Sequence, residues 1–359
     1  MASLLSLVCS DNDQAAITSN HKVRMATYSS SSSSPSFSSD TKSEVEVKVL
    51  TWNVKGVLYE NKEKSKLDRI ENISQYDVMG VTETHLSKED RNRFELRYEG
   101  DYEVYHTTPE YDMRNFIHGV ALLIHKNSIL ASGRLLKEEH WDKEGRVLVY
   151  ETKSYGLIVV AYLPTPNLKR CKMRKEYDES FYKFLVDNED RLLAVMGDFN
   201  MALNDYDKAL NKDHKPIDFG RRYREAANRE NEMIEKCHLF DAFRETFQKN
   251  RVYTSYQEHF YREKGEEKVG RVDYIFLNKK YNLKGRYSLE VLGPAFERDG
   301  SGKFNKECMG SDHRPLVSSM TGIEIVLASS DPVEGSDASV HKRGRLERFG
   351  FSIKKAKTF

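Results

Sequence analysis

A series of short runs rich in apolar, β-branched and aromatic residues constrains the fold of this chain more than any other feature. The runs cover residues 45–52, 78–82, 120–125, 147–150, 157–163, 192–196, 252–256, 272–277, 289–292 and 316–319. Such runs, separated by polar stretches, are typical of β-strands. A run that is apolar throughout, as Leu157–Ala161 is, is typical of a strand covered on both faces. We therefore expect a strand-rich sandwich within residues 45–322.

Helical spacing of apolar residues occurs in a few places between these runs. The stretches 66–73 and 177–186 are candidates, and the clearest is 221–237. In that stretch, residues that can pack on one face recur at helical spacing: Tyr223, Ala226, Ala227, Ile234 and Cys237. We find no internal repeat and no second domain boundary inside residues 45–322. The expected class is α+β, a strand-rich sandwich with covering helices.

The two ends of the chain differ from its centre. Residues 1–44 include the unbroken run Ser29–Ser34 and have little apolar surface to bury, which predicts a disordered Ser-rich tail. An organelle import peptide is an alternative interpretation of this segment. Residues 323–359 are polar and then basic, which predicts a flexible tail. Lys342–Arg345 would be a nuclear-import or phosphate-binding segment in the alternative interpretation.

Composition excludes several classes of protein. No run approaches about 18 consecutive apolar residues, so we expect no membrane span. The four cysteines, at positions 9, 171, 237 and 308, form no CxxC pair and no disulfide framework. They indicate reduced thiols in an intracellular protein, with the nucleus suggested by the basic end. The formal net charge of +1 argues against a protein that binds nucleic acid by charge alone.

A local basic rim can lie within a neutral total, so the net charge does not exclude a nuclease. Such a rim would track phosphates, and it is suggested by a group of cations between two of the runs: Lys208, Lys212, Lys215, Arg221, Arg222 and Arg224. A solvated loop followed by a helix start is an equal alternative for the same residues.

Polar residues with catalytic chemistry lie at or just beyond the ends of several runs. They are Asn53, Glu83, Tyr162, Asp198, Asn200, Asp273, Asp312 and His313. Loops at strand ends are where a rigid scaffold commonly presents catalytic groups. Each of these residues alone is also typical of a turn, a cap or the surface. The ordered set, rather than any single member, indicates a site.

The ordered set resembles the motifs of the endonuclease/exonuclease/phosphatase superfamily of metal-dependent phosphoesterases. The resemblance extends from Val47 to Val317. The matching segments are Thr51–Asn53, Thr82–Thr84, Ala161–Pro164, Gly197–Asn200, Arg271–Tyr274 and Ser311–His313. It implies a four-layer α/β/β/α sandwich with the active site at one end of the two sheets.

The resemblance also implies a role for each residue. Glu83, Asn53 and Asp312 would hold Mg²⁺, with Mn²⁺ as an alternative, because a hard cation prefers carboxylate and amide oxygens. Asp198 would align the attacking water as a general base, and Asn200 would donate a hydrogen bond to the phosphate.

Tyr162 would donate a hydrogen bond to the phosphate or to the leaving group. His313 would contact a phosphate oxygen or shuttle a proton, and Asp273 would orient its ring.

The motifs Gly80–Leu86 and Ser311–Leu316 most closely resemble those of non-LTR retrotransposon endonuclease domains. Abasic-site endonucleases are similar at the first and penultimate motifs, but they usually have Asp where this chain has Lys55 and Trp where it has Gly270. Inositol-type phosphatases are similar at Ser311–Pro315, but their penultimate motif usually reads Trp-Cys-Asp-Arg.

We therefore predict a metal-dependent phosphodiester hydrolase, specifically a DNA endonuclease, whose partner is nucleic acid rather than a membrane and which acts as a monomer. Two alternatives stay open. One is a phosphomonoesterase that acts on a small phosphorylated ligand, and the other is a catalytically inactive binding protein on the same fold.

Overall fold

The protein is described by a computed structural model, which covers residues 45–59, 63–107, 118–136, 142–166, 171–208, 215–216, 218, 220–257, 268–281, 287–296 and 308–321. The tails predicted for residues 1–44 and 323–359 lie outside the described residues, so they stay predictions. Every helix in the described ranges is too short or too polar to cross a lipid bilayer.

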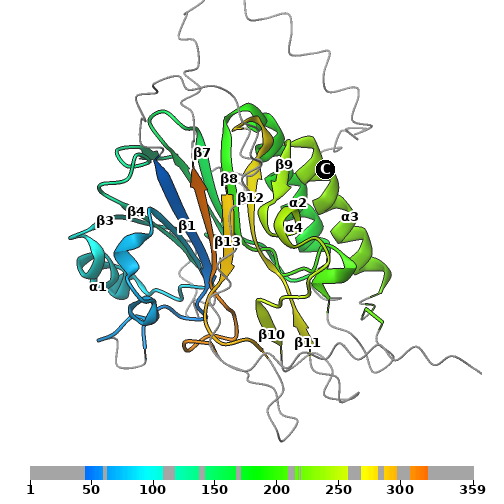
Figure 1. Ribbon diagram of the computed structural model, residues 1–359, viewed down its shortest axis with the longest axis horizontal. Helices are drawn as coiled ribbons and strands as arrows, with labels where there is room; N and C mark the ends of the chain where they lie inside the picture. The colour runs from blue at the N-terminus through cyan, green and yellow to red at the C-terminus, as the bar shows by residue number, and fades with distance from the viewer. Residues whose placement is uncertain are drawn as a thin grey trace, which may run out of the picture. The chain divides into compact units, whose positions relative to one another are not determined.

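Two six-stranded mixed sheets form the centre of the fold (Figure 1). The strands of the first sheet, in spatial order, are β13 (Tyr287–Val291), β14 (Leu316–Thr321), β1 (Glu46–Asn53), β2 (Val78–Thr82), β4 (Val120–His125) and β3 (Tyr102–His106). Those of the second are β5 (Arg134–Leu135), β6 (Val147–Glu151), β7 (Leu157–Tyr162), β8 (Leu192–Asp198), β12 (Asp273–Asn278) and β9 (Leu239–Asp241). The pairs β1–β2 and β7–β8 are parallel, and the other pairs are antiparallel.

The inner faces of the two sheets share one apolar core. Both sheets contribute fully buried side chains to it, among them Val49, Val78, Leu122, Val160, Met196 and Ile275. Side chains alternate between the faces of a strand, so every second residue after a core residue also points inward. Burial of these side chains stabilises the sandwich by about 1.5–3 kcal/mol for each large aliphatic residue. The same alternation decides which polar residues face inward at the strand ends.

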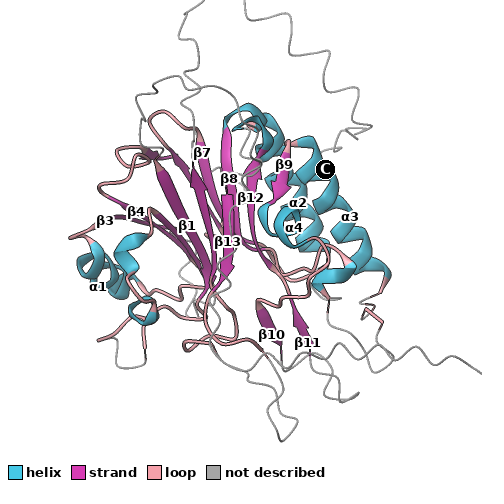
Figure 2. Ribbon diagram, viewed as in Figure 1, coloured by secondary structure: helices cyan, strands magenta, loops and turns pink. Residues whose placement is uncertain are grey.

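Helices cover the outer faces of both sheets (Figure 2). On the first sheet, α1 (Lys88–Tyr98) packs through Phe94 and Tyr98. On the second, α2 (Cys171–Asp187) and α3 (Arg221–Lys236) pack through an apolar layer of their own. The short helix α4 (Ala242–Phe247) contributes Phe243 to the core between the sheets. This arrangement confirms the predicted α+β sandwich, with layers in the order helix, sheet, sheet, helix.

A few predicted elements differ from the observed ones. The expected helix at 66–73 is two separate 3-10 turns, Lys66–Arg69 and Ile73–Gln75, because Asn72 adopts a left-handed φ of 51° that interrupts the helix between them. The run at 252–256 contributes only its end to a strand: β10 (Ser255–Gln257) pairs with β11 (Lys268–Gly270) in a separate two-stranded ribbon.

Candidate active site

The strand ends that carry the predicted site residues meet at one end of the sandwich. In the second sheet, β7 and β8 run parallel, and Asp198 at the end of β8 is in register with both Tyr162 and Asp273. In the first sheet, Asn53 ends β1 beside the start of the antiparallel strand β14. The inward alternation of Val47 and Val49 places Asn53 on the inner face as well.

Gly197 makes the close approach of β7 and β8 possible. It has a φ of +134°, and a Cβ atom there would lie 2.0 Å from the carbonyl oxygen of Ala161. Only glycine fits this position, since any side chain would push apart the two strands that place Tyr162 and Asp198.

Asn53 connects the two sheets at the site. Its side-chain Nδ2 donates to Oδ2 of Asp198 at 2.8 Å and to Oε1 of Glu83 at 3.0 Å. Its Oδ1 accepts a hydrogen bond from the backbone N–H of Lys55 at 3.1 Å. The amide nitrogen, rather than the oxygen, therefore faces the two carboxylates, and in this orientation Asn53 acts as a donor that holds them together.

Asp198 has a fully buried carboxyl group whose pKa lies near neutral pH. Its Oδ1 accepts the backbone N–H of Asn200 at 2.7 Å. Burial and the nearby negative charge of Asp273 raise its pKa to about 7, against the lowering effect of His313. A carboxyl group with a pKa near the working pH is suited to accept a proton during a reaction.

His313 and Asp273 form a buried pair next to Asp198. The ring Nδ1 of His313 lies 2.9 Å from Oδ2 of Asp273, and its Nε2 lies 3.2 Å from Oγ of Ser255. Burial alone would lower the pKa of His313, but the carboxylates of Asp273 and Asp198 outweigh it and raise the pKa to about 10. At neutral pH the ring is therefore a cation that can donate hydrogen bonds.

Backbone and side-chain contacts fix the segment that carries His313. Ser311 Oγ donates to the carbonyl of Asn53 at 2.7 Å and accepts the N–H of His313 at 3.1 Å. Trp52 Nε1 donates to the carbonyl of His313 at 3.0 Å. These contacts join the end of β1 to the segment before β14, so the position of His313 is set by two parts of the chain.

Glu83 is an ionised carboxylate with access to solvent. Burial alone would raise its pKa, but His85, Tyr162 and Asn53 beside the carboxylate lower the pKa to about 2. Its side chain is 19% exposed, and Oε2 lies 3.4 Å from Nε2 of His85. Tyr162 lies under the guanidinium of Arg146, 5.0 Å from its ring centroid. Burial and the charges of Glu83 and Asp198 raise the pKa of Tyr162 well above its usual value, so its hydroxyl stays protonated.

The remaining predicted residues lie at the edge of this group. Asn200, with a left-handed φ of 54°, donates from Nδ2 to the carbonyl of Leu163 at 2.9 Å. Oδ2 of Asp312 pairs with Nζ of Lys55 at 2.8 Å. Lys55, Glu83, His85 and Asn200 all have φ between 46° and 54°, and strained backbone of this kind is often found at functional sites.

The side chains of the site fit a hard divalent cation. Among the described residues, one group brings three ligand atoms within 4.8 Å of one another: Asp198, Asp273 and His313. Oδ1 of Asp273 is buried, and no group in the described residues donates a hydrogen bond to it. Together with Glu83, these carboxylates carry more negative charge than His313 balances, and oxygen donors of this type suit Mg²⁺ or Mn²⁺. The predicted ligand set of Glu83, Asn53 and Asp312 stays a prediction.

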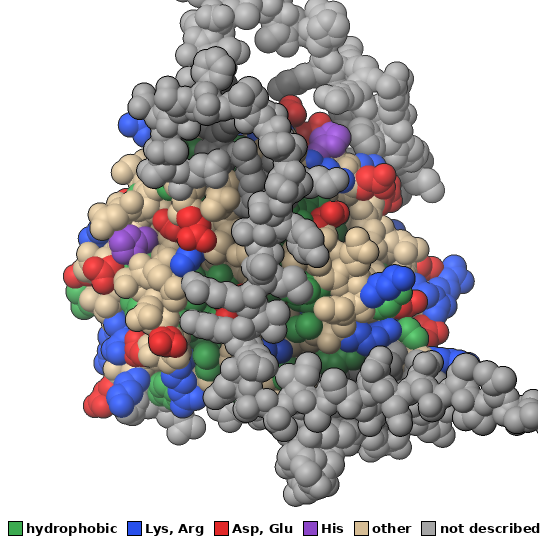
Figure 3. All heavy atoms as spheres, viewed as in Figure 1, with side chains coloured by type: hydrophobic (Ala, Val, Ile, Leu, Met, Phe, Trp, Pro, Cys, Tyr) green, Lys and Arg blue, Asp and Glu red, His purple; other side chains and the backbone are tan. Residues whose placement is uncertain are grey.

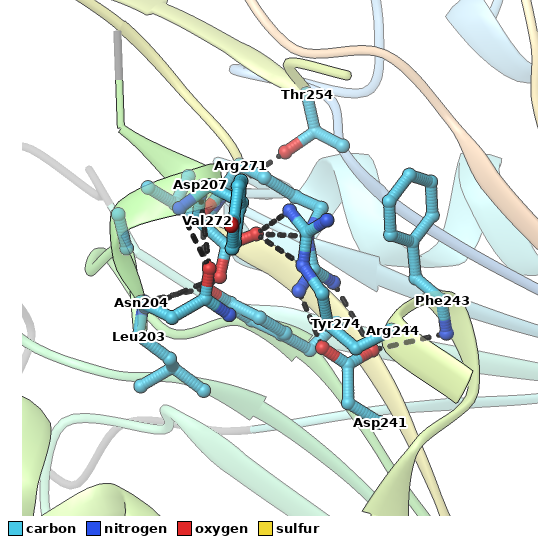
Figure 4. A network of polar contacts seen from close by, with 12 residues as sticks. Leu203, Asn204, Asp207, Asp241, Phe243, Arg244, Thr254, Arg271, Val272 and Tyr274 are labelled. Carbon is cyan, nitrogen blue, oxygen red and sulfur yellow. Dashed lines mark hydrogen bonds and ion pairs between the residues drawn. The ribbon is translucent and has the colours of Figure 1, made fainter. Parts of the chain in front are cut away.

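Two buried arginines that sequence reasoning missed hold the loops behind the site. Arg174 donates to the carbonyls of Pro164 and Phe199, in the loops after Tyr162 and Asp198, and pairs with Asp178 and Glu230. Arg271 lies two residues before Asp273 and belongs to the network in Figure 4.

In that network, Arg271 Nε donates to Oδ1 of Asp207 at 2.7 Å and its Nη1 donates to Oδ1 of Asp241 at 3.1 Å, while Arg244 also pairs with Asp207. No spacing in the sequence signals these partners, because they lie 30 or more residues apart.

In the residues that the structure describes, three cations of the predicted basic rim form ion pairs with carboxylates. Lys208 pairs with Asp205, Arg221 with Glu225 and Arg224 with Asp218. Lys212 and the side chain of Arg222 lie outside the described residues. On the face drawn in Figure 3, Lys and Arg side chains are interspersed with Asp and Glu. The described residues therefore favour the interpretation of a solvated loop and helix start.

Comparison with known proteins places this arrangement among related folds. Residues 50–313 match the sequence model of the Endonuclease/Exonuclease/phosphatase family. The structure is similar to the AP endonuclease LMAP from Leishmania major, with a TM-score of 0.58 and 18% identity over 77% of this chain and 88% of that one.

It is also similar to an AP endonuclease from Archaeoglobus fulgidus (TM-score 0.53, 18% identity, 76% of this chain and 98% of that chain). A 3'-5' exonuclease (NExo) from Neisseria meningitidis is comparable (TM-score 0.55, 19% identity, 76% and 99%). At this identity, the likeness to the three structures shows a shared fold.

Proposed function

The chain belongs to the endonuclease/exonuclease/phosphatase family, and from that premise we propose that it is a metal-dependent hydrolase of phosphodiester bonds that cuts DNA internally. The observation that carries the proposal is the buried group at the strand ends: a carboxylate with a pKa of about 7, Asp198, beside the charged pair of His313 and Asp273. The names of the similar structures, two AP endonucleases and an exonuclease, support nucleic acid as the substrate class.

The residues of the site divide the work of hydrolysis. Asp198 accepts the proton of a water molecule as the water oxygen bonds to phosphorus. His313, a cation at neutral pH, donates a hydrogen bond that stabilises the negative charge on the phosphate, and Asp273 keeps its ring oriented and charged. The protonated hydroxyl of Tyr162 donates toward the phosphate or the oxygen that leaves when the P–O bond breaks. That oxygen takes up a proton, and the products are a phosphomonoester and a hydroxyl group.

The metal ion would bind at the solvent-accessible carboxylate of Glu83. When bound, a divalent ion stabilises the charge that develops on the phosphate oxygens. Asn53 would hold the Glu83 and Asp198 carboxylates at a fixed separation through its hydrogen bonds to both.

Incubation with supercoiled plasmid tests the proposal most directly. Purified protein is expected to convert supercoiled plasmid to the nicked form with Mg²⁺ and to leave it intact with EDTA. Release of inorganic phosphate from small phosphate esters, without nicking, would instead establish a phosphomonoesterase. Inactivity on plasmid, RNA and small esters alike would indicate a binding protein.

The pH dependence of plasmid cleavage tests the assigned charge states. The value of kcat/KM is expected to rise as Asp198 loses its proton near pH 7 and to fall as His313 loses its proton near pH 10. The negative charge of Asp273 raises both pKa values, so Asp273→Asn should move both limbs to lower pH by about 1–3 units. Asp205→Asn, at an exposed position, serves as the control. If neither limb of the pH profile of kcat/KM moved in Asp273→Asn, the charge states assigned to Asp198 and His313 would be contradicted.

A further inference from the structure

We propose that the ammonium group of Lys55 is a built-in cation of the active site, which keeps a divalent metal ion off Asp312 and directs the ion to Glu83. This inference rests on the proposed metal-dependent function. It follows from the position of Lys55, from the anchoring of Asp312, and from the different partners of the two carboxylates.

The backbone at Lys55 is fixed against the site. Its N–H donates to Oδ1 of Asn53, the residue whose amide nitrogen holds Glu83 and Asp198. Its φ of 46° is left-handed, a conformation that a residue with a long side chain adopts only when its surroundings impose it. The side chain of Lys55 therefore leaves the chain two residues after Asn53, which organises the catalytic carboxylates.

Asp312 is held in place to receive this side chain. Its carbonyl accepts the backbone N–H of Tyr256 at 2.8 Å, and its neighbours Ser311 and His313 are fixed by their contacts with the end of β1. Oδ2 of Asp312 lies 2.8 Å from Nζ of Lys55. The ion pair joins the segment after β1 to the segment before β14, and contacts with the end of β1 hold both segments.

The two solvent-accessible carboxylates of the site differ in what balances their charge. Asp312, 27% exposed, already pairs with the ammonium group of Lys55. Glu83 is contacted by the neutral donors Asn53 and Tyr162 and by His85, and the positive charge of His313 also acts on it. A metal ion at Asp312 would have to displace the ammonium group or be repelled by it at close range. At Glu83 the ion would meet the charge of His313, which Asp273 already balances. The ion should therefore select Glu83.

Because the side chain of Lys55 is 57% exposed, solvent weakens the ion pair and a neutral substitution should be tolerated by the fold. In Lys55→Gln, Asp312 loses its charged partner but keeps its backbone anchors. The inference therefore predicts that this variant gains metal affinity, and that the gain depends on the Asp312 carboxylate.

Titration with Mn²⁺, followed by the electron paramagnetic resonance signal of the free ion, tests this without reference to catalysis. In the full-length wild-type protein, Glu83→Gln should weaken Mn²⁺ binding by about tenfold or more, and Asp312→Asn should change it by less than about twofold. In Lys55→Gln the affinity should rise by about threefold or more, and adding Asp312→Asn should remove that gain. Lys48→Gln, which removes the same charge near the opposite end of β1, should leave the affinity unchanged.

The inference is overturned if Asp312→Asn weakens Mn²⁺ binding in the wild type as strongly as Glu83→Gln, or if Glu83→Gln has no effect. Additive effects of Lys55→Gln and Asp312→Asn would also overturn it. If Mn²⁺ bound neither to the wild-type protein nor to any variant, the metal would be removed from the proposed function as well. If all the expected Mn²⁺ affinities were found in a protein that does not nick plasmid, this inference would stand and only the proposed substrate would be contradicted.

Discussion

Replacement of Asp198 by Asn is expected to slow plasmid cleavage by about 10²–10⁴-fold, the range typical of losing a general base. The amide oxygen of Asn can still accept the backbone N–H of Asn200, as Oδ1 of Asp198 does, but an amide cannot accept a proton from water. The change is nearly isosteric and removes the proton acceptor, together with the acceptor of the hydrogen bond from Asn53. The measurement is the initial rate of nicking at saturating Mg²⁺, and Asp205→Asn at the surface is the matched control.

The pH dependence of the stability of this variant separates loss of chemistry from loss of structure, because removal of the buried charge offsets the lost hydrogen bond from Asn53. Burial and the charge of Asp273 raise the pKa of Asp198 to about 7 in the folded state, so the unfolded chain gives up this proton at lower pH than the folded chain does. Ionisation of Asp198 in the folded state therefore lowers the free energy of unfolding progressively as the pH rises toward 7. The full loss is present above pH 7. Asn carries no such cost, so the Tm of the variant relative to wild type should be higher at alkaline pH than at acid pH.

Cleavage by Asp198→Asn within tenfold of the wild-type rate, in protein with an unchanged or higher Tm, would remove Asp198 from the assigned mechanism. A Tm relative to wild type that falls from acid to alkaline pH would instead show that the carboxylate stabilises the folded state, against the repulsion that burial beside Asp273 imposes.

The strand framework could be predicted because burial on both faces leaves a continuous apolar signal. Val78–Thr82 and Val120–His125 were predicted at their observed bounds, and the strand β8 extends the predicted run only by Gly197 and Asp198. These strands lie in the middle of the two sheets. The short edge strands β5 and β9 carry little apolar signal and were not predicted.

The helix α1 was missed because its sequence is almost entirely polar. It buries Phe94 and Tyr98 against the first sheet, too few apolar positions to give a recognisable period. Its start is set by Ser87, whose side chain accepts the N–H of Asp90 at 3.2 Å. A capping signal of this kind is visible in the sequence, but without an amphipathic stripe it does not distinguish a helix from a turn.

In the site, too, some residues could be predicted from the sequence and others could not. Its members could be predicted because each lies at or near the end of a predicted strand, and the structure brings Asn53, Glu83 and Asp198 into direct hydrogen-bond contact. The partners that set their chemistry could not. Ser255 contacts the ring of His313 across 58 residues, and Lys55 reaches Asp312 across 257. Such contacts depend on which distant segments of the chain lie side by side in the fold, which no local pattern records.

Replacement of Arg271 by Met should have the largest effect on stability, about 3–5 kcal/mol, because it removes one partner from a buried ion-pair network. Arg271 and Asp207 are both fully buried, and Asp241 depends on the same guanidinium. The guanidinium also lies over the rings of Tyr274 and Phe243, at 4.3 Å and 4.7 Å from their centroids. Met fills part of this volume but satisfies neither carboxylate, so Asp207 would keep only Arg244 as a charged partner and Asp241 would lose the guanidinium (Figure 4).

For a domain of this size the loss corresponds to a fall in Tm of about 6–20 °C, measured by thermal unfolding. Arg221→Met is the matched control, because Arg221 pairs with Glu225 on the exposed face of α3, where ion pairs contribute little. Cleavage should fall as well, since the side chain of Arg271 ties the chain two residues before Asp273 to Asp207 and Asp241. A Tm within about 2 °C of wild type would mean that Arg244 alone satisfies Asp207 and that the start of β12 does not need the second arginine.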